Sequence, residues 1–599
     1  MPGPRRARVV PAADVCATSP DGAERNGTTK GIELMRKYPV LLGAAALTAA
    51  LITGCSSGDQ TPAADLILKN GRIYTVDDTR EWAQAIVVSG DKIVYVGDDA
   101  GAQAYENDGA QVVDLQGKMV TPGFIDGHNH AYLMAESLFW LNLDRHRTVE
   151  DKQAALRAYR AENPAMPQLR GVGWDDIAED ARARGVLPRQ LIDAAVPDIP
   201  VAIIENSHHT LLANSKALEL AGITKDTPDP EGATIVRDPA TGEPTGELEE
   251  FGAENLVISA LPQSDFTVEQ YRHTILEWQR VAAEDGITST FVPIHYPTES
   301  LLQAFQQLDD EGKLTVRFDL AQWADETKGV SQVAHFVDMR DEYRGTHFTL
   351  DTIKIFADGV GEAKLVWKQD VLEETVAALD AEGFRIYVHA IGSPGFYPED
   401  NVLDAFEVAA QRNGRRDARH AITHLDWTRG EDLARFRELG IIAVPQPAWF
   451  GKGWYDDAPA SEVNNAMRFQ SFLDAGVTVS SSSDFPSTDT FTRDMYPLTG
   501  LEAGMTRVDV DTATEADLGA AQNPQERATL ADMIASYTMG GAHLIFAEDE
   551  RGSLAAGKKA DFVVLDKNLF ELPKTSVGEA KVLATYFEGN EVFRGESMN

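Results

Sequence analysis

The sequence predicts an α/β fold, with a (β/α)8 TIM-like barrel joined to a small β-rich module. Apolar, strand-like runs alternate with helix-periodic stretches over about four hundred residues, which is typical of parallel α/β architecture. Short strand patterns with tight turns precede this region, and segments of the same texture return at the far end of the chain. At 599 residues the chain is long enough for more than one large core.

The β-rich module begins at Asp65. Asn-Gly, Ser-Gly-Asp and Gly-Asp turns separate short runs of β-branched and aromatic residues, which favour an antiparallel arrangement. The expected strands are 66–68, 72–76, 85–88, 92–96 and 111–115, and near the other end 560–565 and 582–587. We expect residues 65–120 and 546–599 to form one sheet domain together.

The barrel is expected over residues 121–545. Its predicted strands are 201–204, 288–292, 352–356, 385–389, 421–423, 441–444 and 478–480, and helices are expected at 371–379 and 432–439. The stretch from about 141 to 285 is too long for one connection between a strand and a helix. It is therefore expected to contain an inserted subdomain.

The charge balance argues against some partners. There are 54 Lys and Arg against 94 Asp and Glu, a net charge of −40, which would repel nucleic acid and anionic lipid headgroups. We interpret the acidity as a solvated surface, with attraction of cationic substrates as the alternative.

The N-terminal region has the layout of an export signal. Arg36 and Lys37 precede an apolar run of 13 residues, 40–52, which is shorter than the ~20 residues that span a membrane. The following Thr53-Gly54-Cys55 resembles a bacterial lipoprotein cleavage site, which implies lipidation of Cys55. Residues 35–54 would then be the signal and 55–64 a flexible tether. Residues 1–34 are expected to be unstructured, or to lie upstream of a true start at Met35.

This layout predicts a place in the cell and restricts the chemistry. The protein is expected on the outer side of the cytoplasmic membrane or in the outer membrane, touching the membrane through the lipid anchor only. Cys16 and Cys55 are the two cysteines, and processing would remove the first and acylate the second. The mature chain would then have no disulfide, zinc–thiolate site or catalytic cysteine.

A candidate metal site follows the β-rich module. His128 and His130 occupy positions i and i+2, which share a face on a strand and can present two imidazoles to one metal ion. His389, His424 and Asp484 each stand at the end of a predicted strand. Active sites of βα barrels lie at the carboxyl ends of the strands, so these side chains are expected to converge. For each of them alone, a capped loop residue is the alternative.

The chain resembles the amidohydrolase superfamily, and specifically the branch that includes N-substituted formamide deformylases. The likeness runs from about Asp65 to Phe593 and rests on these segments: 122–130, 196–201, 209–218, 353–359, 389–392, 483–486 and 552–561. It implies a metal-dependent hydrolase with a (β/α)8 barrel and a composite β-sandwich. Ser393 and residues 360–364 depart from the family pattern, which affects the expected substrate and not the ligands.

The resemblance also implies a ligand set. His128, His130 and Asp484 would bind one metal ion, His389 and His424 a second, and Lys354 would bridge both. An ammonium group cannot bind a cation, so Lys354 must be neutral or carboxylated by carbon dioxide. The alternative is a lysine that reaches solvent or pairs with Asp358. The oxygen and nitrogen ligands suit zinc, as one or two ions, and also tolerate manganese, iron or cobalt.

The expected reaction is hydrolysis of a non-peptide C–N bond in a small molecule, an amide or an N-substituted formamide. A metal ion brings the pKa of bound water towards ~7, so that hydroxide forms and attacks the carbonyl. Asp484 is the expected proton shuttle, accepting the proton and returning it to the leaving amine. His209 and Trp449 are candidate substrate contacts, with a polar strand end and aromatic packing as their alternatives.

Two other functions remain open. The same site could hydrolyse a cyclic amide, a carbamate or an ester. A catalytically inactive surface-binding lipoprotein is the alternative from another class, although such a protein has no chemical need to keep every ligand. The sequence does not indicate an oligomeric state.

Overall fold

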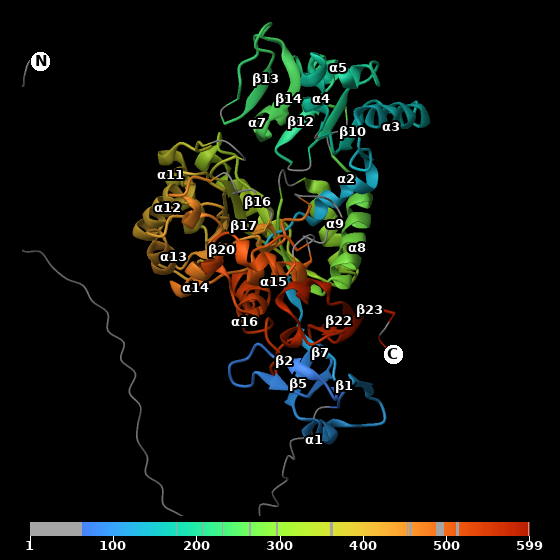
Figure 1. Ribbon diagram of the computed structural model, residues 1–599, viewed down its shortest axis with the longest axis vertical. Helices are drawn as coiled ribbons and strands as arrows, with labels where there is room; N and C mark the ends of the chain where they lie inside the picture. The colour runs from blue at the N-terminus through green and yellow to red at the C-terminus, as the bar shows by residue number, and fades with distance from the viewer. Residues whose placement is uncertain are drawn as a thin grey trace, which may run out of the picture. The chain divides into compact units, whose positions relative to one another are not determined.

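A curled sheet of seven parallel strands forms the centre of this computed structural model (Figure 1). The structure describes residues 63–174, 176–205, 208–230, 232–262, 265–294, 298–359, 363–451, 453, 458–486, 496–510, 514–596 and 598. Residues 61–599 make up one compact unit. The expected signal, tether and Cys55 fall outside the described residues, apart from the last two residues of the tether.

The central sheet has the order β20-β19-β18-β17-β16-β15-β8. The strands are buried on both faces, as expected for parallel strands that are covered by helices. Their bounds are β8 Phe124–Asp126, β15 Ile287–Pro293, β16 Arg317–Trp323, β17 Phe348–Phe356, β18 Arg385–Ala390, β19 Ala421–His424 and β20 Ile442–Val444.

Residues 478–484 connect the two edges of this sheet. Val479 forms a parallel bridge with Ala443 of β20, and the Ser482 amide donates to the Pro445 carbonyl at 3.1 Å. On the other side, the Asp484 amide donates to the His128 carbonyl at 2.8 Å. The expected strand 478–480 is thus reduced to a single bridge, but its place between β20 and β8 brings Asp484 beside the chain that follows β8.

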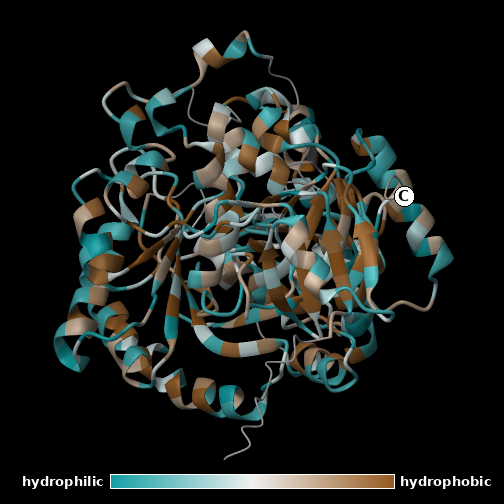
Figure 2. Ribbon diagram, turned by 90° about the horizontal axis from the view of Figure 1, so that it is seen from below, coloured by the Kyte–Doolittle hydropathy of each residue, from teal (hydrophilic) through white to brown (hydrophobic). Residues whose placement is uncertain are grey.

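Helices pack around the central sheet, with hydrophilic residues on their outward faces (Figure 2). In α8, Thr267 caps the first turn: its hydroxyl accepts from the Gln270 amide at 3.2 Å, and the Gln270 side chain accepts from the Thr267 amide at 3.0 Å. Tyr271, Ile275 and Trp278 recur at helical spacing and are buried. The helices that follow the strands are α8 Val268–Glu284, α9 Glu299–Asp310, α10 Val333–Glu342, α11 Gln369–Ala381, α12 Pro398–Asn413, α13 Leu433–Leu439, α14 Gln470–Asp474, α15 Pro497–Thr506, α16 Leu530–Ala535 and α17 Gly541–Leu544.

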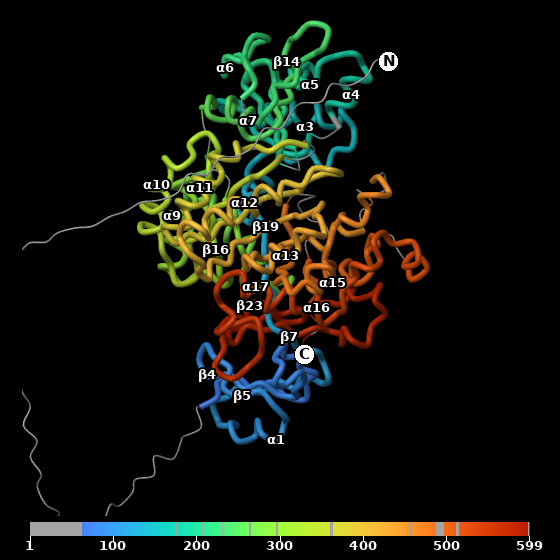
Figure 3. Tube along the Cα trace, turned by 90° about the vertical axis from the view of Figure 1, so that its left-hand side faces the viewer, coloured from blue at the N-terminus to red at the C-terminus, as the bar shows by residue number. Residues whose placement is uncertain are grey.

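The two ends of the described chain share a sheet, and Figures 1 and 3 both show the blue and red strands side by side. One sheet has the order β23-β22-β21-β7-β2-β3, in which β7 from the first part pairs antiparallel with β21. The other has the order β5-β4-β1-β6. The bounds are β1 Leu66–Lys69, β2 Arg72–Tyr74, β3 Trp82–Ala83, β4 Ala85–Ser89, β5 Lys92–Gly97, β6 Gln111–Asp114, β7 Met119–Pro122, β21 Phe562–Leu565, β22 Val582–Phe587 and β23 Asn590–Arg594, with the short helix α1 Asp99–Ala102 after β5.

The expectation of a purely antiparallel module is wrong. β1 pairs parallel with β6, and β2 pairs parallel with β7. The turns between neighbouring strands predict local hairpins, but these two pairs join strands that are separated in the chain. A shared hydrophobic cluster contains residues of both sheets, among them Leu68, Ile86, Val120 and Val564.

A separate six-stranded sheet occupies the expected insertion, in the order β13-β14-β12-β11-β10-β9. The predicted strand 201–204 is β11, and it belongs to this sheet and not to the central one because it pairs with β10 and β12. The strands are β9 Leu141–Asn142, β10 Leu169–Val172, β11 Val201–Ile204, β12 Thr210–Ala213, β13 Thr234–Arg237 and β14 Pro244–Glu249. The helices that precede and accompany it are α2 Met134–Phe139, α3 Val149–Glu162, α4 Asp176–Arg184, α5 Pro188–Asp193, α6 Ser215–Ala221 and α7 Glu250–Ile258.

In the part of the chain that the structure describes, no helix combines the length and the apolar character that a membrane span requires.

A buried ion-pair network ties the central sheet to the terminal strands. Arg317 of β16 donates to Asp561 at 2.7 Å and to Glu588 at 2.7 Å. Its guanidinium also lies 4.3 Å over the ring of Phe587. Arg317 and Asp561 are 6% and 5% exposed, so neither charge has much water to replace a lost partner.

Replacing this arginine should destabilise the protein. We expect Arg317→Met to lower the free energy of unfolding by about 3 kcal/mol, because it leaves the Asp561 carboxylate buried without its cation. The matched control is Arg72→Met, which removes an exposed ion pair with Glu571 and should cost less than about 0.5 kcal/mol. Urea denaturation followed by circular dichroism measures both, and equal losses in the two variants would contradict the prediction.

Candidate metal centre

Three predicted ligands converge in a buried cluster. The Nε2 atoms of His128 and His130 lie 3.1 and 3.2 Å from Oδ1 of Asp484, and 3.3 Å from each other. The side chains of these three residues are almost fully buried. They form the one group of three or more histidine, cysteine or acidic residues, among those the structure describes, whose ligand atoms lie close enough to hold a metal ion.

The hydrogen bonds of the two imidazoles leave their Nε2 lone pairs directed at this cluster. His130 Nδ1 lies 3.0 Å from the Pro293 carbonyl, an acceptor only, so Nδ1 carries the proton. His128 Nδ1 lies 2.8 Å from the Tyr387 hydroxyl, which itself donates to the Gly127 carbonyl at 3.1 Å. The His128 ring therefore donates through Nδ1 too. A metal ligand needs this tautomer with this kind of partner on its other nitrogen.

The protonation states also suit a cation. Burial, with the nearby charge of Lys354, lowers the pKa of His128 well below its usual range, and burial likewise lowers the pKa of His130. Burial alone would raise the pKa of Asp484, but the charge and hydrogen bond of a protonated His128 hold it well below its usual range. A divalent cation between these atoms would take the place of that proton, which leaves two neutral imidazoles and an ionised carboxylate as its ligands.

The position of the histidines differs from the sequence prediction in one respect. They were expected on a strand, but β8 ends at Asp126 and both follow it. Asp126 fixes this turn: its carboxylate accepts from the His128 amide at 3.1 Å and from the Ser483 hydroxyl at 2.5 Å. Burial raises the pKa of Asp126 to about 6. One side chain thus positions the residues on both sides of the cluster.

The close approach of these two segments requires a small residue. A Cβ on Gly127 would lie 2.5 Å from the Ser480 hydroxyl and 3.0 Å from the Ser481 carbonyl. Asp484 itself has a φ of 57°, and His424 a φ of 71°, in the left-handed region that non-glycine residues rarely adopt. Strained backbone of this kind is concentrated at functional sites.

His389 and His424 lie next to the cluster but do not join it. Their ring centroids are 4.4 Å apart, and the His424 ring is 5.2 Å from that of His128. His424 Nδ1 contacts Gln446 Oε1 at 3.1 Å, while Nε2 of His389 lies 3.5 Å from Asp358 Oδ1 and forms no hydrogen bond among the described residues. Burial lowers the pKa of His424 to about 3 and that of His389 well below its usual range. Both rings are therefore neutral and able to bind a second cation.

Lys354 is buried in the same region. It is 1% exposed, so the side chain does not reach solvent, and its Nζ lies 4.7 Å over the Phe356 ring and 5.3 Å over the Tyr387 ring. Burial lowers the pKa of Lys354 to about 7, against the opposing charges of Asp484 and Asp358. Burial also raises the pKa of Asp358 to about 8, although that carboxyl accepts from the Ile391 and Gly392 amides.

The two predicted substrate contacts lie beside the second histidine pair. The Trp449 ring is stacked on His424 with centroids 5.8 Å apart, and the His209 ring is 5.7 Å from His389. His209 Nδ1 contacts Glu250 Oε2 at 2.9 Å. The prediction for Cys55 lies outside the described residues.

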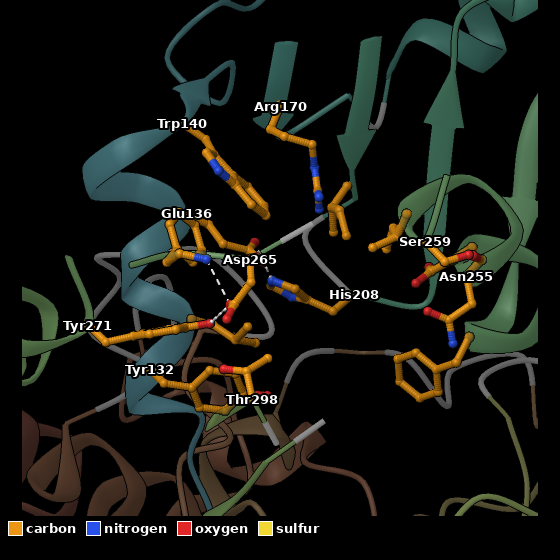
Figure 4. Close-up of a pocket in the computed structure, with 16 residues that line it drawn as sticks. Tyr132, Glu136, Trp140, Arg170, His208, Asn255, Ser259, Asp265, Tyr271 and Thr298 are labelled. Carbon is orange, nitrogen blue, oxygen red and sulfur yellow. Dashed lines mark hydrogen bonds and ion pairs between the residues drawn. The ribbon is translucent and has the colours of Figure 1, made fainter. Parts of the chain in front are cut away.

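A cavity of about 280 Å³ is lined by Tyr132, Glu136 and Arg170, among other residues (Figure 4). Tyr132 lines it, and the Tyr132 ring is 6.2 Å from that of His130. Phe251 lines it from α7, and its ring is 5.3 Å from that of His209. Residues of α2 and of the inserted subdomain form much of the wall. The cavity is thus separated from His130 by the Tyr132 ring, and from His389 by the rings of Phe251 and His209.

Sequence reasoning missed several residues of this site. Tyr387 could have been found, because it lies two positions before His389 on the same predicted strand and so shares its face. Asp126 and Gln446 gave no signal, since their partners are far away in the sequence. His208 was not among the predicted residues, yet it lines the cavity and contacts Glu136 at 3.1 Å.

Comparison with known proteins identifies the family. The model of the amidohydrolase family matches residues 111–593. Protein LONG AFTER FAR-RED 3 of Arabidopsis thaliana is 28% identical over 88% of this chain and 92% of its own length. An N-substituted formamide deformylase of Arthrobacter pascens is 27% identical over 88% of this chain and 97% of its own.

A solved structure has the same fold. An uncharacterized metal-dependent hydrolase from Pyrococcus horikoshii superposes with a TM-score of 0.64 at 22% identity, and the match covers 85% of this chain and 99% of that one. Because the family model covers more than half of the sequence, the chain belongs to the amidohydrolase family, as an enzyme that hydrolyses carbon–nitrogen bonds other than peptide bonds.

Proposed function

We propose that the protein hydrolyses the C–N bond of an amide or N-substituted formamide at a metal centre held by His128, His130 and Asp484. The observation that carries this proposal is the buried contact of two Nε2 atoms with one carboxylate oxygen, at 3.1 and 3.2 Å. Neutral imidazoles around an ionised carboxylate fit a divalent cation, and these nitrogen and oxygen donors suit zinc. The likeness to a formamide deformylase supports the choice of substrate.

The second part of the proposal concerns a further ion. His389 and His424 would hold it, and Lys354 would bridge the two ions after carboxylation by carbon dioxide. A pKa of about 7 leaves much of the Lys354 amine neutral, and only the neutral amine can react with carbon dioxide. These ligands would complete the carboxyl-end face of a closed (β/α)8 barrel, attached to a composite β-sandwich.

A bound divalent metal ion lowers the pKa of water and polarises a carbonyl group. The residues of this chain then supply orientation and proton transfer. Tyr387 and the Pro293 carbonyl hold the imidazoles in the tautomer that ligation needs. Asp484 is ionised and can accept the proton of the attacking water and pass it to the departing amine, which is too basic to leave without it. The cavity beside Tyr132 holds the substrate and limits access of bulk water.

We also propose that the chain is exported and anchored through a lipid on Cys55, in the cell envelope. The support is the order of basic residues, apolar run and Gly54-Cys55 in the sequence. A hydrolase placed there would act on a small molecule outside the cytoplasm.

Metal content tests the centre directly. Elemental analysis of a form beginning after Cys55 should give two ions per chain, with at most one in His130→Ala and one in Lys354→Ala. His347→Ala is the matched control, because His347 is partly buried on Asp309, far from the cluster in the fold, and should keep both ions. One ion in both the parent and Lys354→Ala would contradict the bridging lysine. A parent protein that holds no metal after reconstitution would contradict the whole metal centre.

Activity tests the role of the carboxylate. With N-(2-phenylethyl)formamide as substrate, Asp484→Asn should lower kcat/KM at least about 100-fold, since both a ligand and the proton carrier are lost. Asp351→Asn, an exposed position on β17, is the control and should change it less than about twofold. Measurement of the released amine and formate gives the rates. Turnover of a matched lactone or carbamate, but not of the formamide, would favour the alternative hydrolase activity.

A further inference from the structure

An arginine of the inserted subdomain faces the cavity beside the proposed metal centre. Arg170 extends from β10 into the cavity, next to Trp140 (Figure 4). The residue is 7% exposed, and its guanidinium carbon lies 4.0 Å over the Trp140 ring. Stacking on an indole holds a guanidinium in one orientation and leaves its edges available for hydrogen bonds.

Two of the three nitrogens of this guanidinium form no hydrogen bond within the protein. Nε and Nη1 of Arg170 are buried and have no hydrogen-bond partner among the described residues. A buried cation without an acceptor is costly, and the chain keeps this one in the wall of a cavity. An anionic group of a ligand would remove that cost.

Glu136 and Glu254 attract Arg170 through their charge, but among the described residues neither forms a hydrogen bond with its Nε or Nη1. Glu136 contacts His208 at 3.1 Å, and Asp265 accepts from the Tyr271 hydroxyl at 2.7 Å. Glu254 is 2% exposed, and its Oε1 has no partner among the described residues. Burial, together with the charges of Glu250 and Glu136, raises the pKa of Glu254 well above its usual range. A protonated Glu254 is a hydrogen-bond donor, so it does not compete with an anion.

The remainder of the wall is apolar. The apolar lining residues come from the two ends of α2, from β11, from α7 and from the segment before α8: Leu133, Trp140, Ile204, Phe251 and Phe266. Such a surface binds an aliphatic or aromatic group by excluding water. The cavity thus has a cationic group, Arg170, at one place in a largely apolar wall.

We propose that this cavity binds an apolar molecule that carries a carboxylate, with the carboxylate accepting hydrogen bonds from Arg170 and Glu254. If the protein has the proposed function, on which this step rests, the substrate of the hydrolysis is an N-acyl or N-formyl amine that carries a carboxylate. The carboxylate lies at the inserted subdomain, and the scissile bond lies towards His130, past Tyr132.

Direct binding tests the site without turnover. Isothermal titration calorimetry of the metal-loaded protein is carried out with 3-phenylpropionate and with 3-phenylpropanamide. The two probes share the same apolar group and differ only in carrying a carboxylate or a neutral amide. The parent should bind the carboxylate at least about tenfold more tightly, and Arg170→Gln should abolish that difference while the amide binds as before. Arg182→Gln, an exposed arginine of the same subdomain, should behave as the parent.

Three outcomes would overturn the inference. The first is equal affinity of the parent for the two probes, which needs no variant. The second is an equal loss of affinity for both probes in Arg170→Gln, which would show that Arg170 has a structural role. The third is loss of 3-phenylpropionate binding by the parent after its metal is removed with a chelator, which would place the carboxylate on the metal.

Turnover separates this inference from the proposed function. The parent should hydrolyse N-formylphenylalanine with a kcat/KM at least about tenfold above that for N-(2-phenylethyl)formamide, and Arg170→Gln should remove the preference. If the binding results hold and neither compound is hydrolysed, the carboxylate site stands and the proposed reaction fails. If both are hydrolysed equally well by the parent, the reaction stands and the assignment of this site to the substrate is overturned.

Discussion

The structure depends on keeping one carboxylate ionised in the protein interior. Asp484 is 6% exposed, and a buried negative charge is tolerated only where hydrogen bonds and opposite charge replace water. His128 and His130 meet it at Oδ1, and Asp126 holds the two segments that carry these residues. The contact lies where the two edges of the central sheet come together: residues 478–484, which carry the carboxylate, join its edge strands. A shift of register at either edge would separate the charge from its partners.

The sequence was sufficient for the parts of the site that depend on position along a strand. Strand-end positions predicted that His128, His130, His389, His424 and Asp484 converge, because the carboxyl ends of parallel strands meet at one edge. The grouping of the first two with Asp484 was implied by the resemblance to the amidohydrolase superfamily. The strand pattern places Tyr387 on the same face as His389, but its contact with His128 and the contact of Asp126 with Ser483 join residues more than two hundred positions apart, which no local pattern reveals. Strand β16 was missed because Arg317, Asp319 and Gln322 interrupt its apolar run. The parallel pairing of β1 with β6 depends on the direction of a distant strand, and alternation of residues is the same for either direction.

Chemistry and recognition come from different parts of the fold. The candidate ligands stand on or directly after strands of the central sheet, whereas Arg170 and Glu254 belong to the inserted subdomain. The central sheet is tightly constrained, since its ligands must meet within a few tenths of an ångström. The inserted sheet carries no ligand and can change its cavity-facing residues independently. A family with one reaction and many substrates is the expected outcome of this separation.

The pairing of β7 with β21 has a consequence for how the protein is made. β7 leads through Gly123 into β8 and the two histidines, yet one of its edges is covered by a strand that lies more than four hundred residues later. On the ribosome this edge stays open until β21 has been translated, and an unpaired strand edge can pair with the wrong partner. A nascent chain that stalls before residue 562 would therefore hold the two histidines in a turn just beyond a strand, β7, that has lost one of its neighbours.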